Sequence, residues 1–344
     1  MRNKILATLL LGALSLSLAL SLSLCLPLRA QAAGQPLRIG WVYAMANAPA
    51  AIAEQQGLFA AEGLKVELKS FGDGPLLQQA VAAGEIDVAY VGAPPVYQWF
   101  SRGLEGKILA KVNSGQAAVI ASNEAGIKTV ADLRGKKLAG VAKGSGMDVL
   151  LRGYVLKDYA KLDPEHDLSI VAMPPSNMNA ALDRHVADAA FSWEPFVSEA
   201  LLRGGSRLVL DVNKALPNYP WYVIMAVPKT LHERPDDVVK LLRAHNKAIA
   251  FLNEQPDAAN RIIIDTFKIA PVQTVDGKTV APEAVAREAR KRLGWSARLE
   301  ASDQQFIQRL MDYSLALGFI PKPLKVEQLL DLSWQQKAQP KAAP

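Results

Sequence analysis

Short apolar segments alternate with amphipathic segments along the chain from residue 37 onward. The apolar segments have the length and composition of β-strands, and they lie at 37–43, 65–71, 88–91, 117–121, 137–141, 168–173, 187–191 and 208–212. The segments between them place apolar residues at helical spacing, at 50–61, 75–83, 129–133, 147–157, 177–182 and 195–202. Strands that alternate with helices in this way predict an α/β protein with parallel sheets flanked by helices.

The strand–helix units form two sets, which predicts two lobes of similar build. An aromatic, β-rich segment follows at 220–227, and predicted helices at 235–254, 256–267, 281–293 and 302–317 are expected to cover the first lobe. We assign 33–121 and 222–334 to the first lobe and 122–221 to the second. The chain then crosses between the lobes near 120–124 and 215–222, as a hinge of two strands. The Lys/Gln/Ala/Pro composition of 335–344 predicts a disordered tail.

The first 32 residues have the pattern of a secretory signal. Arg2 and Lys4 precede a long Leu/Ser/Ala core, which ends before the small-residue motif Ala30-Gln31-Ala32. The core is nearly long enough to span a bilayer, so a retained anchor is the alternative. Its serines and the Ala-x-Ala motif favour cleavage after Ala32, while Leu24 before Cys25 does not fit a lipid-anchor motif. We therefore predict a periplasmic protein.

The composition of the remaining chain excludes several classes of function. Cys25 is the only cysteine, so the mature chain has neither a disulfide nor thiol chemistry. The leader carries three of the positive charges, which lowers the formal net charge from +6 to about +3. No dense basic run indicates nucleic-acid binding, and no later segment is long and apolar enough to span a membrane.

The chain also lacks the usual motifs of an enzyme. The four histidines lack the spacing of metal ligands, and Ser145 lacks the Gly-x-Ser-x-Gly context of a nucleophile. We therefore predict no catalytic residue, no metal site and no cofactor.

Three glycine-rich turns join a predicted strand to a predicted helix. They are Gly72-Asp73-Gly74-Pro75, Gly92-Ala93-Pro94-Pro95 and Gly144-Ser145-Gly146-Met147. Such turns can present unpaired N–H groups to an oxyanion, at the strand ends where α/β proteins bind ligands. The alternative is that they are only tight turns. Two turns from one lobe and one from the other favour a shared ligand site for a sulfonate, a carboxylate or nitrate.

Individual polar residues of these turns allow more than one interpretation. Ser145 is the sharpest candidate for a ligand contact, because the glycines on both sides let a ligand approach closely. Asp73 either caps the following helix or pairs with an amine of the ligand. Glu194, before Pro195, either caps a helix or binds the cationic end of a zwitterion such as taurine.

Aromatic residues supply candidate walls for the same site. Tyr43 ends the first predicted strand and Trp193 ends another, so both are candidates for lining a pocket. We expect Trp41 in the core and Trp221 outside the pocket.

These segments together resemble the periplasmic binding proteins of ABC importers for aliphatic sulfonates, taurine and nitrate, a family that also contains binders of thiamine-precursor pyrimidines. The resemblance covers residues 37–225, and 269–280 departs from it as a polar insertion between helices. The motifs that carry it are Leu37–Tyr43 with Glu62-Gly63-Leu64, Ala83–Ala89, Gly92–Pro95, Leu133–Leu138 with Lys143–Ser145, and Asp188–Ala190 with Trp193–Pro195.

The resemblance implies a two-lobed, venus-flytrap fold that closes on a small anionic ligand and delivers it to a membrane permease. The ligand contacts carried over from the family are Tyr43, Gly72, Asp73, Gly74, Gly92, Ala93, Pro94, Ser145, Gly146, Met147, Trp193 and Glu194. An aliphatic sulfonate or a taurine-like solute is the first expectation, with nitrate, an aromatic carboxylate or a pyrimidine as alternatives. A sensor that docks to a receptor and an enzyme on the same fold are the alternatives of other classes. Proteins of this kind usually act as monomers.

Overall fold

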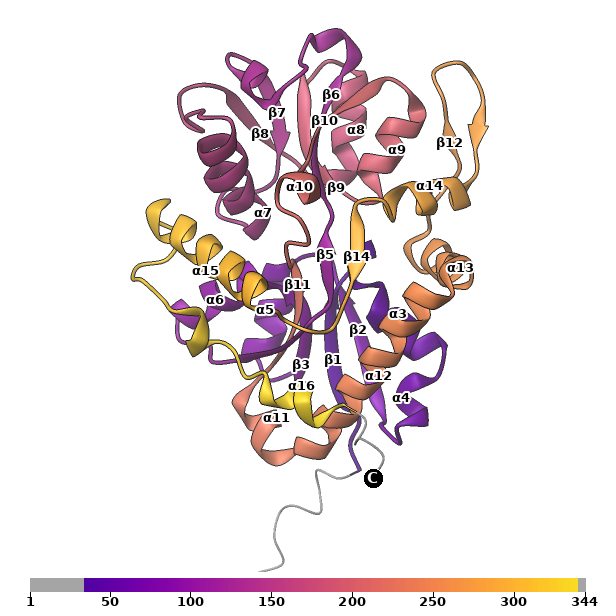
Figure 1. Ribbon diagram of the computed structural model, residues 1–344, viewed down its shortest axis with the longest axis vertical. Coiled ribbons are helices and arrows are strands. Elements are labelled where there is room, and N and C mark those ends of the chain that lie inside the picture. Colours follow the sequence, from indigo (N-terminus) through magenta and orange to yellow (C-terminus); the bar gives the residue numbers. More distant parts are fainter. Residues whose placement is uncertain (1–33, 340–344) are drawn as a thin grey trace, which may run out of the picture. The chain divides into compact units, whose positions relative to one another are not determined.

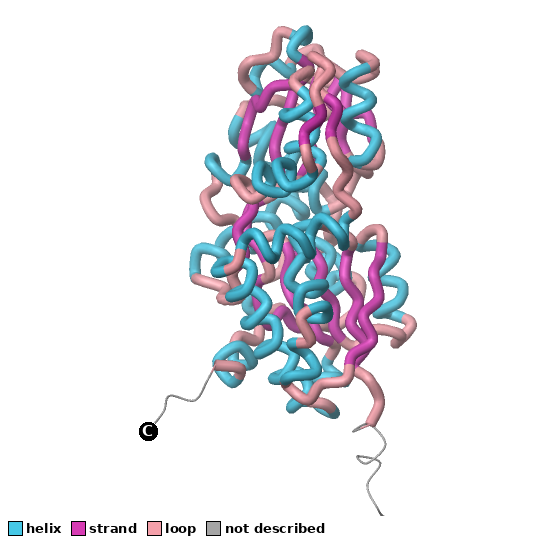
Figure 2. Tube along the Cα trace, turned by 90° about the vertical axis from the view of Figure 1, so that its right-hand side faces the viewer, coloured by secondary structure: helices cyan, strands magenta, loops and turns pink. Residues whose placement is uncertain are grey.

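Two five-stranded sheets form the framework of the chain (Figures 1 and 2). The computed structural model describes residues 34–339, so the predicted signal at 1–32 and the last five residues lie outside the described part. The strands of the first sheet, in spatial order, are β2 (Val66–Phe71), β1 (Leu37–Val42), β3 (Val88–Gly92), β11 (Tyr222–Ala226) and β4 (Lys107–Lys111). Those of the second are β10 (Ser206–Asp211), β6 (Ala117–Ser122), β9 (Ala189–Trp193), β7 (Lys137–Gly140) and β8 (Ser169–Ala172).

One strand in each sheet runs against its neighbours, whereas the sequence pattern predicted parallel sheets. In the first sheet β11 is antiparallel to β3 and β4, and in the second β6 is antiparallel to β9 and β10. Both are strands by which the chain enters a sheet from the hinge. Because they enter at the edge where the parallel strands end, they must run in the opposite direction.

The first crossing between the lobes lies before β6, not at 120–124 as expected. Residues 117–121 pair with β9 and β10, so these residues, expected in the first lobe, belong to the second sheet. The crossing is the short strand β5 (Asn113–Gly115), and Ser114 bridges to Pro220 on the second crossing. A third segment, β14 (Leu293–Trp295), pairs with β5 and widens the hinge.

Side chains hold the two crossings together. The Oδ1 atom of Asn113 accepts a hydrogen bond of 2.8 Å from the Tyr222 N–H. The Tyr219 hydroxyl accepts one of 3.0 Å from the Ala117 N–H. The crossings are therefore coupled by buried hydrogen bonds as well as by strand pairing.

Helices cover both sheets. Those before β11 are α3 (Ala48–Gln55), α4 (Leu58–Ala61), α5 (Gly74–Ala82), α6 (Ala93–Ser101), α7 (Gly146–Val149), α8 (Pro175–Asp183), α9 (Phe196–Arg203) and α10 (Val212–Ala215). The helix expected at 50–61 is interrupted at Gly57, whose φ of +64° ends α3. The helix expected at 147–157 consists of α7 and a π-helical continuation, η5 (Leu150–Tyr159). The 3₁₀ turns are η2 (Met45–Asn47), η3 (Asn123–Ala125), η4 (Val130–Leu133) and η6 (Val326–Gln328).

The C-terminal helices divide between the lobes instead of covering only the first. They are α11 (Pro228–Glu233), α12 (Pro235–Glu254), α13 (Pro256–Phe267), α14 (Pro282–Ala289), α15 (Ala301–Ala316) and α16 (Ser333–Lys337). α12 packs against α3 and α4 in the first lobe, whereas α14 packs against α9 of the second. The hairpin of β12 (Val272–Gln273) and β13 (Thr279–Val280) also reaches the second lobe, where the Val275 N–H donates to the Arg203 carbonyl.

The start of the predicted tail is ordered by one aromatic residue. Trp334 is buried in α16, and the Lys337 amine lies 4.2 Å from the centre of its ring. The prediction of disorder is therefore wrong for 335–337, and 340–344 lie outside the described residues.

A buried polar cluster lies beneath the first sheet. His245 of α12 is fully buried, with its Nε2 atom 3.0 Å from the Lys111 carbonyl oxygen and its Nδ1 atom 3.4 Å from the Tyr90 hydroxyl. Burial lowers the pKa of His245 to about 4, because the charged ring would lose its hydration. His245 is therefore a neutral core residue.

Across residues 34–339, we find no helix with the combined length and hydrophobicity that crossing a membrane requires.

Candidate functional site

The three glycine-rich turns meet one another between the two sheets. A Cβ atom placed on Gly74 would lie 3.2 Å from the Cγ atom of Pro95, so the two turns of the first lobe are in contact. A Cβ atom placed on Gly146 would lie only 2.7 Å from the Cβ atom of Pro94, which belongs to the other lobe. Gln98 adds a hydrogen bond across the same junction, from its Nε2 atom to the Gly144 carbonyl at 3.0 Å. We call the segments 72–75, 92–95 and 144–147 the facing turns.

The turn at 92–95 does not supply the N–H groups that the sequence pattern suggested. The Ala93 N–H donates to the Trp221 carbonyl at 2.9 Å, and Pro94 and Pro95 have no N–H. This turn therefore contributes shape and apolar surface rather than donors for an anion.

The turn at 72–75 carries a carboxylate of its own. Asp73 caps α5, because its Oδ1 atom accepts a hydrogen bond of 2.9 Å from the Leu76 N–H. Of the two interpretations of Asp73, the structure supports the helix cap. An exposed carboxylate at this position also repels an anion from the turn.

The turn at 144–147 retains backbone donors. Ser145 is the N-cap of α7 and accepts a hydrogen bond of 3.3 Å from the Asp148 N–H. The N–H groups of Gly146 and Met147 are the first two of the helix, which have no carbonyl within it to bond. This turn therefore combines two adjacent backbone donors with the Ser145 hydroxyl.

A buried carboxylate already lies at the same helix end. Asp148 is fully buried, accepts from the Gly144 N–H at 2.8 Å and from Arg152 Nε at 2.7 Å. Burial raises the pKa of Asp148, and these two donors oppose the rise. Because Arg152 balances its charge, the turn can still receive an anion.

Aromatic residues lie at the strand ends from which the facing turns begin. The Tyr43 ring is 43% exposed and lies 5.1 Å from the ring of Phe267 and 5.7 Å from that of Trp41. Its hydroxyl donates to the Thr266 carbonyl at 2.6 Å, so Tyr43 presents a ring rather than a polar tip. Trp193 is half-buried at the end of β9. Because β9 is parallel to β7, this end lies at the edge of the second sheet from which the turn at 144–147 begins.

Trp221 lies between the facing turns, which the sequence did not lead us to expect. Its Nε1 atom would lie 3.6 Å from a Cβ atom on Gly92, and its Cζ2 atom 3.4 Å from one on Gly146. The signal in the sequence is its position just before β11, whose first residue, Tyr222, pairs with Gly92, but that pairing is visible only in the folded sheet.

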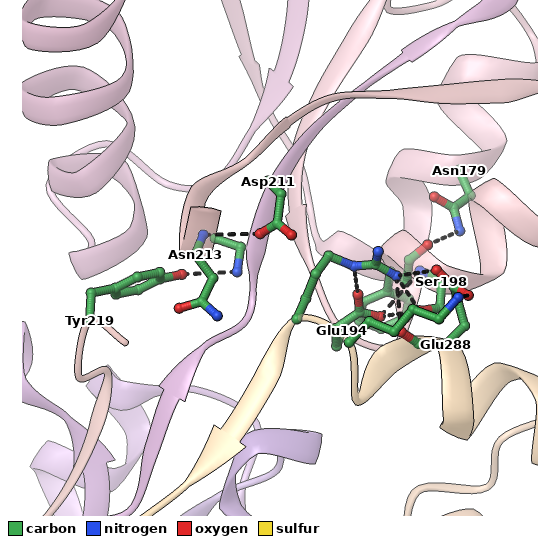
Figure 3. A network of polar contacts seen from close by, with 11 residues as sticks. Asn179, Glu194, Ser198, Asp211, Asn213, Tyr219 and Glu288 are labelled. Atoms are coloured by element: carbon green, nitrogen blue, oxygen red, sulfur yellow. Dashed lines mark hydrogen bonds and ion pairs between the residues drawn. The ribbon is translucent and has the colours of Figure 1, made fainter. Parts of the chain in front are cut away.

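Glu194 is committed to a buried ionic cluster and cannot serve as a free ligand contact in this structure (Figure 3). Its carboxylate pairs with Arg292, and its Oε2 atom accepts a hydrogen bond of 2.6 Å from the Ser198 hydroxyl. Arg292 also contacts the Ser198 hydroxyl at 2.9 Å and Glu288 at 3.2 Å. Burial raises the pKa of Glu194, and the Arg292 charge opposes that rise. The cluster fastens the hinge segment before β14 to the second lobe.

Two surface pockets are lined by residues outside the facing turns. One, of about 430 Å³, is lined by residues 216–220 and by Ser302, Asp303, Gln305, Phe306 and Arg309 of α15. The other, of about 380 Å³, lies between the β12–β13 hairpin and the second lobe. Neither is lined by a residue that we predicted to contact a ligand. The facing turns are instead in direct contact, as they would be in a closed form.

Solved structures of periplasmic binding proteins share this fold. The aliphatic sulphonate-binding protein SsuA of Escherichia coli superposes with a TM-score of 0.72 at 22% identity, covering 86% of this chain and 91% of that one. The nitrate-binding protein NrtA of Synechocystis superposes with a TM-score of 0.70 at 17% identity, covering 88% of each chain. The chain therefore has the two-lobed fold of the periplasmic binding proteins of ABC importers.

Sequence comparison identifies the family. Residues 30–265, more than half of the chain, match the model of the NMT1-like family, and the chain belongs to that family. A Bacillus subtilis relative bearing the name of an aliphatic sulfonates-binding protein is 27% identical over 296 residues, 84% of each chain. A binding protein of Brucella abortus is 27% identical over 309 residues, which cover 87% of this chain and 91% of that one.

The same fold also carries an enzyme. The desulfurization enzyme DszB superposes with a TM-score of 0.62 at 18% identity, covering 88% of this chain and 98% of that one. The fold alone therefore does not distinguish a binding protein from an enzyme.

Proposed function

We propose that this protein is the extracytoplasmic solute-binding component of an ABC importer and that it captures a small organic sulfonate between its lobes. Membership of the NMT1-like family and relatives named for aliphatic sulfonate binding support this class. The single observation that carries it is the contact of Gly146 with Pro94, since it brings helix starts from separate sheets together at their ligand edges.

In this proposal, the ligand binds while the lobes are apart and is enclosed when they come together. The N–H groups of Gly146 and Met147, with the Ser145 hydroxyl, receive the acid group. The rings of Trp221, Tyr43 and Trp193 contact the organic part. Closure excludes water, and that strengthens the hydrogen bonds to the anion.

Aromatic residues around the turns favour an organic sulfonate over nitrate. Trp221 and Tyr43 offer apolar surface that an inorganic ion of four atoms would leave unused. An aromatic carboxylate and a pyrimidine are the other organic candidates. We further propose export through the predicted signal, delivery to a membrane permease and action as a monomer.

A binding role is also favoured over an enzyme of the DszB kind. Residues 34–339 contain no cysteine, and the carboxylates nearest the turn at 144–147 and at the end of β9, Asp148 and Glu194, are each paired with an arginine. These groups are therefore held as structural ions rather than as a free nucleophile or base.

Thermal unfolding of the mature chain with candidate ligands tests this proposal. The ligands are ethanesulfonate, isethionate, taurine, nitrate, benzoate and a methylated aminopyrimidine, with sulfate at equal ionic strength as control. A ligand present at 100 times its Kd stabilises the native state by about 2.7 kcal/mol. We expect at least one sulfonate to raise the Tm. A shift with nitrate, benzoate or the pyrimidine and with no sulfonate would contradict the proposal.

A further inference from the structure

Gln116 combines complete burial with an unusual backbone conformation. It lies between β5 and β6, at the first crossing between the lobes, and is 1% exposed. Its φ of +130° lies in the region that glycine adopts freely and other residues rarely do. A side chain at this position therefore costs free energy that glycine would not.

The amide of Gln116 is not satisfied within the protein. Its Nε2 atom lies 3.9 Å from the Met147 sulfur, a weak acceptor, and its Oε1 atom has no hydrogen-bond partner among the described residues. The contact with Met147 places the side chain at the start of α7, beside the turn that retains N–H donors. An unpaired buried oxygen has lost its hydration without gaining a hydrogen bond, which destabilises the folded state.

Asn47 has the same property in the first lobe. It is fully buried, and its Nδ2 atom donates to the carbonyls of Val42 at 2.8 Å and Tyr90 at 3.4 Å. These two carbonyls fix the orientation of the amide, so the other end must be the oxygen. That Oδ1 atom also lacks a partner among the described residues. Because Val42 ends β1, Asn47 lies at the ligand edge of its sheet.

Asn47 in the first lobe and Gln116 at the crossing thus each have a buried carboxamide oxygen in need of a donor. The carboxylates nearby are unavailable to balance a cation, since Glu194 pairs with Arg292 and Asp148 with Arg152. A neutral N–H or O–H group satisfies a carbonyl oxygen without bringing a charge into the interior, whereas an ammonium group does bring one.

We propose that Asn47 and Gln116 are specificity-determining residues, and that each oxygen accepts a hydrogen bond from a neutral donor on the ligand. This inference rests on the proposed function and narrows it. The preferred solute is an organic anion that carries hydroxyl or amide N–H groups besides its acid group, rather than a plain alkanesulfonate.

Isothermal titration with two matched sulfonates tests the inference. Isethionate and ethanesulfonate differ only by a hydroxyl group, and taurine replaces that hydroxyl with an ammonium group. We expect the wild-type chain to bind isethionate about tenfold more tightly than ethanesulfonate, and more tightly than taurine. In Gln116→Met, which keeps the side-chain volume but removes the amide, the preference for isethionate should fall severalfold.

The stability of the variants separates a ligand contact from a structural role. Gln116→Met removes an unpaired oxygen, so its Tm without ligand should equal or exceed that of the wild type. Gln116→Gly removes the cost of a side chain at a φ of +130°, and this variant should likewise lose the preference for isethionate. Gln56→Met, at an exposed position at the end of α3, is the matched control and should leave both affinities unchanged.

The outcomes separate this inference from the function on which it rests. If all three sulfonates bind equally, or if Gln116→Met keeps the wild-type preference, the oxygens are satisfied by buried water and the inference is wrong while the function stands. Tighter binding of taurine than of isethionate would contradict the inference that the ligand's donor is neutral. If no sulfonate binds, the proposed function itself is wrong.

Discussion

Removing Arg292 should destabilise the protein strongly, because it would leave a buried carboxylate without its counter-charge. Glu194 is 1% exposed and Arg292 is 3% exposed, so water cannot replace the guanidinium. Breaking a buried ion pair from one side typically costs about 3–5 kcal/mol. The Ser198 hydroxyl would remain as a partner of Glu194, but it carries no charge. We therefore expect Arg292→Met to lower the free energy of unfolding by about 3–5 kcal/mol.

Urea denaturation of a double-mutant cycle measures this effect. The variants are Arg292→Met, Glu194→Gln and the double variant. The double variant should recover much of the loss, because it buries no unpaired charge. Arg298→Met is the matched control, since Arg298 and Glu300 are exposed and such pairs contribute about 0–1 kcal/mol. A loss below about 1 kcal/mol for Arg292→Met, or a double variant as unstable as the sum of the single ones, would refute the reasoning.

Two further predictions concern the core and the facing turns. His245 has a pKa of about 4 when folded and about 6.5 when unfolded, so the unfolded state binds the extra proton between these values. The contribution of neutral His245 to the free energy of unfolding is complete above pH 6.5, and about 3 kcal/mol of it is lost as the pH falls toward 4. The free energies of unfolding of wild type and His245→Gln, measured by urea titration, should therefore converge as the pH falls. Parallel pH dependences of the two proteins would contradict this. In Gly146→Ala the added Cβ atom meets Pro94 at 2.7 Å, which should weaken binding of the sulfonate found by the thermal screen about 5- to 150-fold. Gly205→Ala, whose nearest contact would be 3.6 Å away, is the control, and equal affinities in titration calorimetry would show that the turns do not meet in the bound form.

The local pattern of the sequence was enough to locate most elements of both sheets. The predicted helices 235–254 and 256–267 coincide with α12 and α13, because each begins with a proline and has apolar residues at helical spacing. Thr129 and Asp132, which are three residues apart, form a capping box at the start of η4. The α6 helix begins at Ala93, within the turn that was predicted to precede a helix, since Pro94 and Pro95 resemble a turn when tertiary packing is unknown.

The candidate site was predicted as a set of turns but not as a set of interactions. The convergence of the facing turns followed from the rule that ligands bind at the carboxyl ends of strands. Which N–H groups are free did not follow from the sequence, because the Trp221 carbonyl that occupies the Ala93 N–H lies far along the chain. Whether the predicted residues contact a ligand stays a prediction.

The sequence by itself determined which segments form strands, helices and glycine-rich turns, because period, caps and proline positions act over a few residues. Only the tertiary structure decided how charged and polar groups are paired. Glu194 meets Arg292 across nearly a hundred residues, and Asn47 and Gln116 are left with unpaired oxygens. Pairing of this kind depends on burial and distance between remote segments, and no local pattern encodes either.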